Sequence, residues 1–317
     1  MQDIKETVSR IRQEVSKVIS GQETVIEELL VGILMNTGHL LLEGVPGTGK
    51  TLLVKTLAYI MDCEFKRVQF TPDLMPSDII GTNMYNFAAG SFNLKKGPVF
   101  THLLLADEIN RTPPKTQAAL LEAMEEKQVT IDGTSYPLEE PFLVFATQNP
   151  IEHEGTYPLP EAQLDRFVMK SIMTYPSRSE EMSVLRSYQE GFRADQIDQA
   201  GVNKVLSRSD ILTIRQKIKD VRVEEAIYDY IMAIIEGTRN NFNLMVGASP
   251  RASINLLLAG KVLAAVEGRN YVIPDDIKKL ARPILRHRLV LKPEAEIEGL
   301  TPDHVIQVIL DSVQVPR

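Results

Sequence analysis

A glycine-rich stretch near the start of the chain holds the residue types best suited to chemistry. Residues 44–51 read GVPGTGKT and lie between a mostly apolar run, 39–42, and a helix-compatible run, 52–61. Glycines let the backbone curl so that several N–H groups face one anion, and the N-terminus of the following helix adds a partial positive charge. This pattern predicts a phosphate-binding loop between a strand and a helix, and therefore a bound nucleotide.

Two side chains of that loop have expected roles. Lys50 is expected to reach the β- and γ-phosphates, and the Thr51 hydroxyl is expected to ligate Mg²⁺. Upstream, Ile19 belongs to an aliphatic turn at 18–22 that could lie against an adenine ring. Packing in the core explains Ile19 equally well, so the sequence leaves its role open. Nucleotide contacts are expected from Gly44, Val45, Pro46, Gly47, Thr48, Gly49, Lys50, Thr51 and Leu52.

Two adjacent carboxylates, Asp107 and Glu108, follow a second apolar run at 102–106. Strand alternation predicts that their side chains lie on opposite sides of the strand. At the carboxyl end of a parallel strand beside the phosphate loop, Asp107 is expected to hold Mg²⁺ through its water shell. Glu108 is then expected to polarise the water that attacks the γ-phosphorus, because this reaction depends mostly on positioning and charge stabilisation.

A polar amide lies at the tip of a third apolar run. Asn149 follows residues 142–147 and precedes Pro150. At a strand tip beside the phosphate loop, its amide could hold the attacking water or the γ-phosphate. An asparagine before proline is also typical of a turn, and that alternative stays open.

Two arginines are candidates for contacts with phosphate. Arg166 precedes another apolar run, 167–174, and is a candidate for donation across a subunit interface; a salt bridge to Asp165 or Glu161 is the alternative. Arg251 lies in the first turn of a predicted helix, where it could bind phosphate together with the helix N-terminus. A solvated arginine is the alternative for Arg251.

The elements that position these residues follow from periodicity and turn residues. Apolar residues at helical spacing predict two helices before the loop, and apolar runs predict buried strands after it. Turn residues predict inserted hairpins near 82–94 and 128–138, the second around an Asp-Gly turn. Near residue 176 the composition changes, and the rest of the chain shows helical patterns without clear strands. Two domains are therefore expected, at 1–176 and 177–317.

Composition narrows the function classes. The chain has 317 residues and a net charge of −7, which argues against a protein that coats nucleic acid. Neither a signal peptide nor a membrane-spanning run is apparent, so a cytoplasmic location is expected. The basic run 282–288 is interpreted as a solvated or subunit-facing patch. No metal-ligand spacing is found among the five histidines, His39, His102, His153, His287 and His304.

The order of these motifs resembles that of an AAA+ ATPase, and more narrowly the MoxR family. The segment 104–117, LLADEINRTPPKTQ, looks like the family signature. Residues 146–150, 159–167 and 285–289 fit the same family, so the resemblance covers essentially the whole chain. It implies an α/β fold with the P-loop NTPase core, a parallel sheet sandwiched by helices, followed by a smaller all-α lid domain.

The resemblance also implies roles and partners. Lys50 and Thr51 would be the phosphate-loop ligands, and Asp107 the Mg²⁺ carboxylate. The catalytic group would be Glu108, with Asn149 as sensor 1, Arg166 as the arginine finger and Arg251 as sensor 2. The family forms rings, commonly hexamers, in which ATP turnover to ADP drives chaperone-like remodelling or maturation, including metal insertion. Its usual partners contain a von Willebrand factor type A domain.

Three other functions are compatible with parts of the sequence. The first is an ATP-gated interaction switch with negligible turnover, and the second is a nucleic-acid-dependent motor, against which the acidic balance weighs. The third, a small-molecule kinase, fits the phosphate loop alone and is disfavoured by the Asp-Glu pair and the helical second domain.

Overall fold

A five-stranded parallel sheet forms the centre of the computed structural model, which describes residues 1–88, 90–149 and 155–316. Pro150 and His153 lie outside these ranges. The strands lie in the order β2-β5-β8-β1-β9, and every pairing is parallel. Their bounds are β1 Leu40–Gly44, β2 Phe65–Gln69, β5 Leu103–Asp107, β8 Leu143–Gln148 and β9 Met169–Met173.

Each face of the sheet is covered by helices, which explains why its three central strands, β1, β5 and β8, are apolar on both sides. Leu40 and Leu42 pack in one core cluster, whereas Leu41 packs in the other, as alternation along a strand requires. Helices α1 (Gln2–Ser16), α2 (Glu23–Leu34) and α3 (Lys50–Ile60) belong to the first cluster. Helices α4 (Pro76–Ile80) and α5 (Pro114–Glu126) belong to the second. The predicted α/β core with helices on both faces is confirmed.

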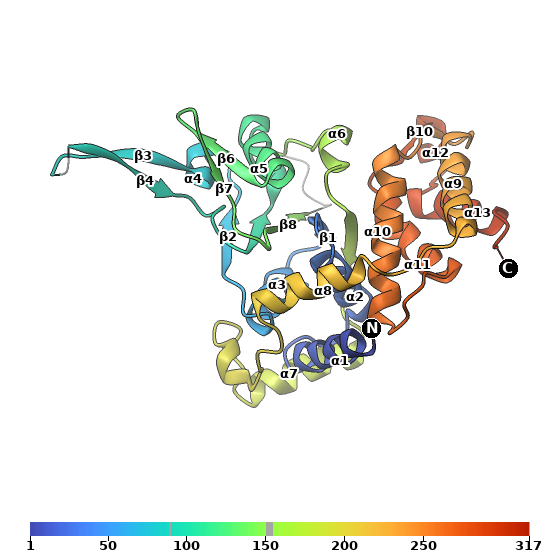
Figure 1. Ribbon diagram of the computed structural model, residues 1–317, viewed down its shortest axis with the longest axis horizontal. Helices are drawn as coiled ribbons and strands as arrows, with labels where there is room; N and C mark the ends of the chain where they lie inside the picture. Colours follow the sequence, from blue (N-terminus) through green and yellow to red (C-terminus); the bar gives the residue numbers. More distant parts are fainter. Residues whose placement is uncertain (89, 150–154, 317) are drawn as a thin grey trace.

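Two hairpins interrupt this core at the expected positions. The first pairs β3 (Gly81–Asn86) with β4 (Ser91–Lys96) and projects from the body of the molecule (Figure 1). The second pairs β6 (Gln128–Ile131) with β7 (Thr134–Pro137) beside α5. Two short elements complete this region, η1 (Ile109–Arg111) and α6 (Glu161–Leu164).

Glycines close the base of the projecting hairpin. A Cβ on Gly81 would lie 2.3 Å from the carbonyl oxygen of Lys95, and a Cβ on Gly97 would lie 2.2 Å from that of Ile79. Gly81 also has a φ of +99°, which L side chains rarely adopt. The two ends of the hairpin therefore meet backbone to backbone where they join the core.

The second half of the chain is mostly helical. It also contains a short antiparallel pair that the sequence did not predict, β10 (Leu244–Val246) with β11 (Val290–Leu291). Among the described residues, we find no helix with the length and apolar character needed to cross a membrane. The helical elements are α7 Arg178–Gln189, η2 Ile197–Ala200, α8 Arg208–Ile218, α9 Glu225–Arg239, α10 Pro250–Val266, α11 Pro274–Leu285, α12 Pro293–Ile297 and α13 Pro302–Ser312.

Within the basic run at 282–288, His287 and Arg288 are buried and Arg286 is half-buried, whereas Arg282 is exposed. The interpretation as a solvated or subunit-facing patch is therefore wrong for His287 and Arg288 and stays a prediction for Arg282. Arg288 is 6 % exposed, and its Nε donates to the Asp165 carboxylate at 2.7 Å. Its other nitrogens donate to backbone carbonyls at 165–168. His287 is buried beside it and contacts the carbonyl oxygen of Phe167 through Nε2. The reason is pairing, because a buried guanidinium is tolerated when carboxylate and carbonyl acceptors surround it.

The lowered pKa of the buried His39 leads to a prediction of how the free energy of unfolding depends on pH. The backbone N–H of Val144 donates to its Nδ1, and its Nε2 lies 3.1 Å from the carbonyl oxygen of Met124. Burial lowers the pKa of His39 from 6.5 to about 4. Because the unfolded chain binds this proton more readily, the free energy of unfolding is expected to fall by about 3 kcal/mol as pH drops from neutral to 4.

Urea unfolding at pH 7 and at several acid pH values measures this loss. The non-titrating variant His39→Gln should show a shallower decline than the parent chain. An unchanged slope in that variant would show that His39 does not carry the effect.

Candidate active site

The predicted functional residues meet at the carboxyl edge of the sheet. Strand β1 leads toward β2 on one side, whereas β8 leads to β9 on the other, so the strand order reverses between β1 and β8. Open α/β sheets bind ligands at such a reversal. The parallel registers place the ends of β1, β8 and β5 next to one another, which brings the phosphate loop, Asp107 and Asn149 together.

The loop after β1 is shaped by its glycines. Gly47 and Gly49 have φ values of +85° and +87°, in the region that glycine adopts without strain. A Cβ on Gly44 would lie 2.7 Å from the carbonyl oxygen of Met173 on β9, so a larger residue would push the strands apart. Lys50 curls back over the loop, and its Nζ donates to the carbonyl oxygens of Gly44 at 2.5 Å and Val45 at 3.0 Å. The ammonium group therefore lies inside the loop, and burial lowers its pKa.

A cavity of about 420 Å³ opens over this loop. Most of the residues predicted for nucleotide and metal binding line it, together with others that the sequence did not indicate. The predicted ones are Pro46, Gly47, Thr48, Gly49, Lys50, Thr51, Leu52, Asp107, Glu108 and Asn149. The others are Arg67, Thr147, Gln148, Tyr188 and Ala194.

Asp107 is held from two sides. The Arg67 side chain on β2 donates to its Oδ2 from Nε at 3.0 Å and from a terminal nitrogen at 2.5 Å. The Thr147 hydroxyl on β8 donates to its Oδ1 at 2.5 Å. Asp107 is 8 % exposed, so its carboxylate is oriented before any ligand arrives. Arg67 supplies the positive charge next to it.

Glu108 does not continue the strand, and the expectation that the two carboxylates lie on opposite sides was wrong. Strand β5 ends at Asp107, and Glu108 has a φ of +57°. Its backbone N–H donates to the Thr147 hydroxyl oxygen at 2.8 Å. This left-handed turn brings both carboxylates to one cavity, at a backbone conformation that is strained for a residue with a Cβ and is common at functional sites.

The Glu108 carboxylate has partners of its own. Gln69 on β2 donates from Nε2 to its Oε2 at 2.6 Å. Arg111, one turn further along the chain, lies 3.1 Å from the same oxygen through its Nε. Both partners engage Oε2, one of the two oxygens that could accept a proton from water. Glu108 is thus oriented, but by groups that compete with a water molecule for it.

The donor set fits Mg²⁺ bound mainly through a nucleotide. Among the described residues, no cluster of three or more His, Cys, Asp or Glu side chains could hold a metal by itself. The cavity instead offers one carboxylate, Asp107, and one hydroxyl, Thr51, beside the phosphate loop. Mg²⁺ characteristically takes one or two protein oxygens and completes its shell with phosphates and water.

Five predicted residues do not line this cavity: Gly44 and Val45 at the start of the loop, and Ile19, Arg166 and Arg251. Arg166 and Arg251 both bind Glu125 on α5, at 2.5 Å and 3.0 Å between nitrogen and carboxylate oxygen. One of the two alternative partners predicted for Arg166, Asp165, is bonded to Arg288 and Ser249 instead. Ile19 is 8 % exposed and packs in the core cluster of α1–α3. The two arginines thus share one place at the surface, separate from the phosphate loop of their own chain.

Several site residues gave a weak signal or none in the sequence. Arg67 and Gln69 sit two apart on β2, and polar residues on one face of an expected buried strand could have indicated a site. Thr147 precedes the strand tip and looks like an ordinary strand threonine. Tyr188 comes from a segment beyond the sheet, so only the tertiary structure places it here.

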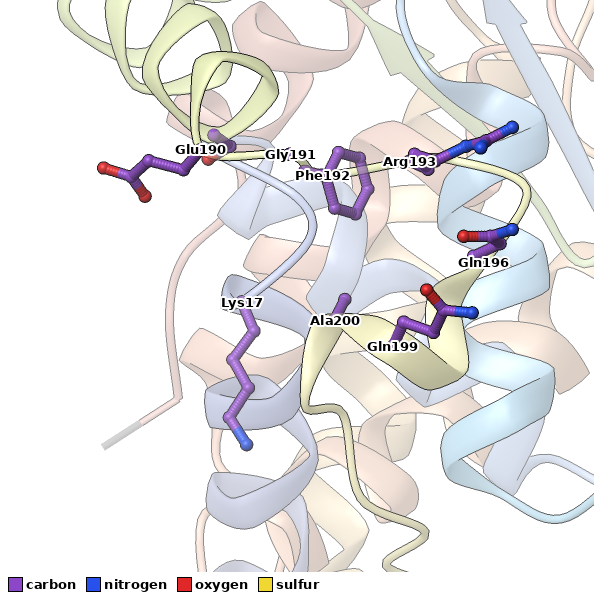
Figure 2. Close-up of a pocket in the computed structure, with 9 residues that line it drawn as sticks. Lys17, Glu190, Gly191, Phe192, Arg193, Gln196, Gln199 and Ala200 are labelled. Carbon is purple, nitrogen blue, oxygen red and sulfur yellow. The ribbon is translucent and has the colours of Figure 1, made fainter.

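The segment around Tyr188 also lines a second cavity of about 300 Å³ (Figure 2). Lys17 from the end of α1 closes one side of it, and Phe192 and Arg193 come from the stretch after α7. The Phe192 ring packs edge-on against Tyr188, which itself lines the phosphate-loop cavity. Residues 187–200 therefore form a wall between two cavities.

Comparison with known proteins identifies the family. Residues 39–169 match the model described as ATPase family associated with various cellular activities, and residues 236–309 match the AAA lid domain. The chain is 45% identical to Chaperone MoxR1 of Mycobacterium tuberculosis over 320 residues, covering 98% of this chain and 83% of that protein. The chain belongs to the MoxR family of AAA+ ATPases.

Other relatives of this MoxR family member support the same family assignment. Protein MoxR of Methylorubrum extorquens is 30% identical, with 99% of this chain and 96% of that protein covered. Uncharacterized protein YeaC of Bacillus subtilis is 44% identical, over 99% of this chain and 97% of that protein. A crystal structure from Cytophaga hutchinsonii superimposes with a TM-score of 0.91 at 47% identity, covering 100% of this chain and 97% of the other. Family membership implies a nucleotide-binding protein.

The contact between Arg67 and Asp107 suggests a substitution that would change the Mg²⁺ concentration this MoxR protein needs to bind ADP. Its guanidinium is bonded to the carboxylate that would face the metal, so the two cations compete for Asp107. We expect Arg67→Gln to lower the Mg²⁺ concentration needed for half-maximal binding of ADP severalfold. Titrating Mg²⁺ at a fixed concentration of fluorescent ADP measures this.

The neighbouring Lys66→Gln is the matched control, because Lys66 pairs with Glu64 and the carbonyl oxygen of Phe100 instead. A fall in metal-free ADP affinity in Arg67→Gln, with no change in the Mg²⁺ requirement, would show that Arg67 binds the nucleotide directly.

Proposed function

We propose that this chain hydrolyses ATP in a homo-oligomeric ring, commonly a hexamer in its family, and uses the turnover to remodel a partner protein. One observation carries the proposal. A phosphate loop, Asp107, Glu108 and Asn149 line a single cavity, whereas Arg166 and Arg251 lie elsewhere on the same chain. This division fits an active site completed by a neighbouring copy.

In this proposal the phosphate loop and Lys50 bind and orient the triphosphate. Lys50 exchanges the carbonyl oxygens of Gly44 and Val45 for phosphate oxygens. Asp107 and Thr51 would hold Mg²⁺, which would supply neutralising charge. Glu108 takes a proton from the attacking water, and Asn149 orients that water or the γ-phosphate. The bond from the γ-phosphorus to the bridging oxygen breaks as the bond to water forms.

Three contacts of the two carboxylates must change before this reaction can proceed. Glu108 has to exchange Gln69 and Arg111 for water, and Asp107 has to release Arg67 toward the metal. Binding of nucleotide and assembly of the ring are the events proposed to release these contacts.

Arg166 and Arg251 are proposed to act together on the ATP of the next subunit. Both are bonded to Glu125, so a surface that presents one arginine also presents the other. An arginine aimed at the transferring phosphoryl group stabilises its charge in the transition state. Glu125 would have to release both guanidinium groups when they engage phosphate.

The projecting β3–β4 hairpin is the proposed contact for the partner. Phe87 is 90 % exposed and Phe92 is 70 % exposed, and both rings pack edge-on against Tyr85. An exposed aromatic cluster on a monomer marks an interaction surface. The partner is proposed to contain a von Willebrand factor type A domain, as the resemblance to the family implies.

An ATP-gated switch with negligible turnover is the second candidate. The observation that favours it is the engagement of Glu108 by Gln69 and Arg111, which would block hydrolysis if it persisted with ATP bound. Steady-state hydrolysis measured across protein concentrations separates the two functions. Turnover that rises with assembly supports the ATPase, and negligible turnover at all concentrations supports the switch.

The variant Glu108→Gln tests the proposed base. A neutral amide cannot take the proton, so we expect ATP binding to persist while kcat falls by about 10²-fold or more. Phosphate release and binding of fluorescent ATP provide the two measurements. Glu298→Gln, an exposed carboxylate directly after α12, is the control. Hydrolysis near the parent rate by Glu108→Gln would rule out its assignment as the base.

Mixed assemblies test donation between chains. Arg166→Ala should bind ATP but lose about 10³-fold in kcat. Mixing it with Lys50→Ala should restore part of the activity, because an intact loop can then meet an intact arginine. The same result is expected for Arg251→Ala, and Arg10→Ala, an exposed arginine on α1, is the control. Mixed rings that form without recovering activity would contradict donation in trans.

A further inference from the structure

A third cavity, of about 210 Å³, lies away from the phosphate loop. Its walls come from the end of α2, from α8 and from α10, with Glu140 at one side. Leu34, Met35 and Val262 are among the apolar residues that line it. Helix α2 packs against the sheet, whereas α10 belongs to the stretch that matches the AAA lid domain. The cavity thus lies where the core and the lid meet.

A buried arginine lines this cavity. Arg215 on α8 is only 7 % exposed, and a terminal nitrogen donates to the carbonyl oxygen of Ile33 at 2.8 Å. Its Nε has no hydrogen-bond acceptor among the described residues. Nor does any carboxylate of the described residues lie within ion-pair distance of its guanidinium. Burial lowers the pKa of Arg215 to about 10, which reflects the cost of keeping this charge away from water.

The charge around the cavity is positive. Lys219 and Lys261 line it together with Arg215, and Lys261 donates to the carbonyl oxygen of Lys219. The only acidic residue among those that line it, Glu140, is already bonded to Lys127 at 2.7 Å. Apolar side chains make up most of the remaining wall. The site therefore combines an excess of positive charge with an apolar interior.

We propose that this cavity binds a small amphiphilic carboxylate, with its head group on Arg215 and the two lysines and its alkyl chain between α2, α8 and α10. A carboxylate adds negative charge where three cations line the cavity, and guanidinium–carboxylate pairs form strong charge-assisted bonds. The cavity is smaller than the roughly 300–1,000 Å³ of sites for drug-sized ligands, so the ligand is a short chain.

Capping of α2 accounts for only part of this arrangement. Arg215 bonds to a carbonyl in the last turn of α2, where a cation is favoured by the helix dipole. An exposed arginine or lysine would satisfy that carbonyl without the cost of burial. Capping also does not explain the cavity or the two lysines that line it. A bound anion accounts for both.

Binding of hexanoate to the full chain tests the proposal without nucleotide. We expect saturable binding by calorimetry and a rise in Tm, with hexanol at least about tenfold weaker, since a hydrogen bond to a charged group contributes more than a neutral one. Hexylammonium should not bind. Across butanoate, hexanoate and octanoate, affinity should rise about fourfold per methylene until the cavity is full. Equal binding of hexanol and hexanoate, or no saturable binding, would overturn the proposal.

Variants locate the binding site. Arg215→Met should remove the preference for hexanoate over hexanol. Leu258→Trp should block the cavity while leaving Arg215 in place, so it remains informative if Arg215→Met does not fold. Ile254→Trp, one turn away on the same helix and outside this cavity, is the control and should bind hexanoate normally. Hexanoate binding that survives Leu258→Trp unchanged would place the ligand elsewhere.

These experiments need neither ATP nor assembly. Failure of hexanoate to bind therefore leaves the proposed ATPase function untouched. Failure of the Glu108→Gln test likewise leaves this cavity untouched, because Glu108 lies at the phosphate loop and not among the residues that line it.

Discussion

The carboxylate of Asp165 fixes how the helical half of this chain sits on the nucleotide-binding half. It accepts from Arg288 at the end of α11 and from the hydroxyl of Ser249, the residue that caps α10. Because both partners are far from Asp165 in the sequence, one side chain sets the placement of two lid helices. Arg166 follows Asp165 directly, and Arg251 follows Ser249 by two positions. The same anchor therefore brings the two arginines to one edge and keeps Arg251 away from the phosphate loop of its own chain.

The polar groups of the nucleotide cavity satisfy one another before a ligand arrives. Lys50 bonds to the loop's own carbonyls, Arg67 to Asp107, and Gln69 to Glu108. Charged groups left without partners in a partly buried site would be costly, and these internal contacts avoid that cost. When phosphate, metal and water bind, each of these polar groups exchanges one partner for another and does not form a contact where it had none. At the cavity between core and lid, by contrast, the Nε of Arg215 has no such partner among the described residues.

Local sequence patterns predicted much of the fold and the centre of the site, because short-range rules govern them. The glycines and Lys50 of the phosphate loop act within eight residues of one another, and the apolar runs alone indicate buried strands. The turn of the backbone at Glu108 was missed, since alternation holds only while the strand continues. Burial of Arg288 was missed as well, because its partner Asp165 lies 123 residues away along the chain. Arg67 and Gln69 became site residues only through the register of β2 with β5.

The close approach of the two backbones at the base of the β3–β4 hairpin has a consequence for how the sequences of such chains can diverge. The chain leaves at Gly81 and returns at Gly97, where the two backbones meet so closely that neither glycine has room for a Cβ. The length and side chains beyond that neck can vary while the strands and loop that surround the nucleotide keep their positions. The hairpin can therefore change without disturbing the nucleotide site, and recognition of a partner can evolve on it separately from the chemistry of the core.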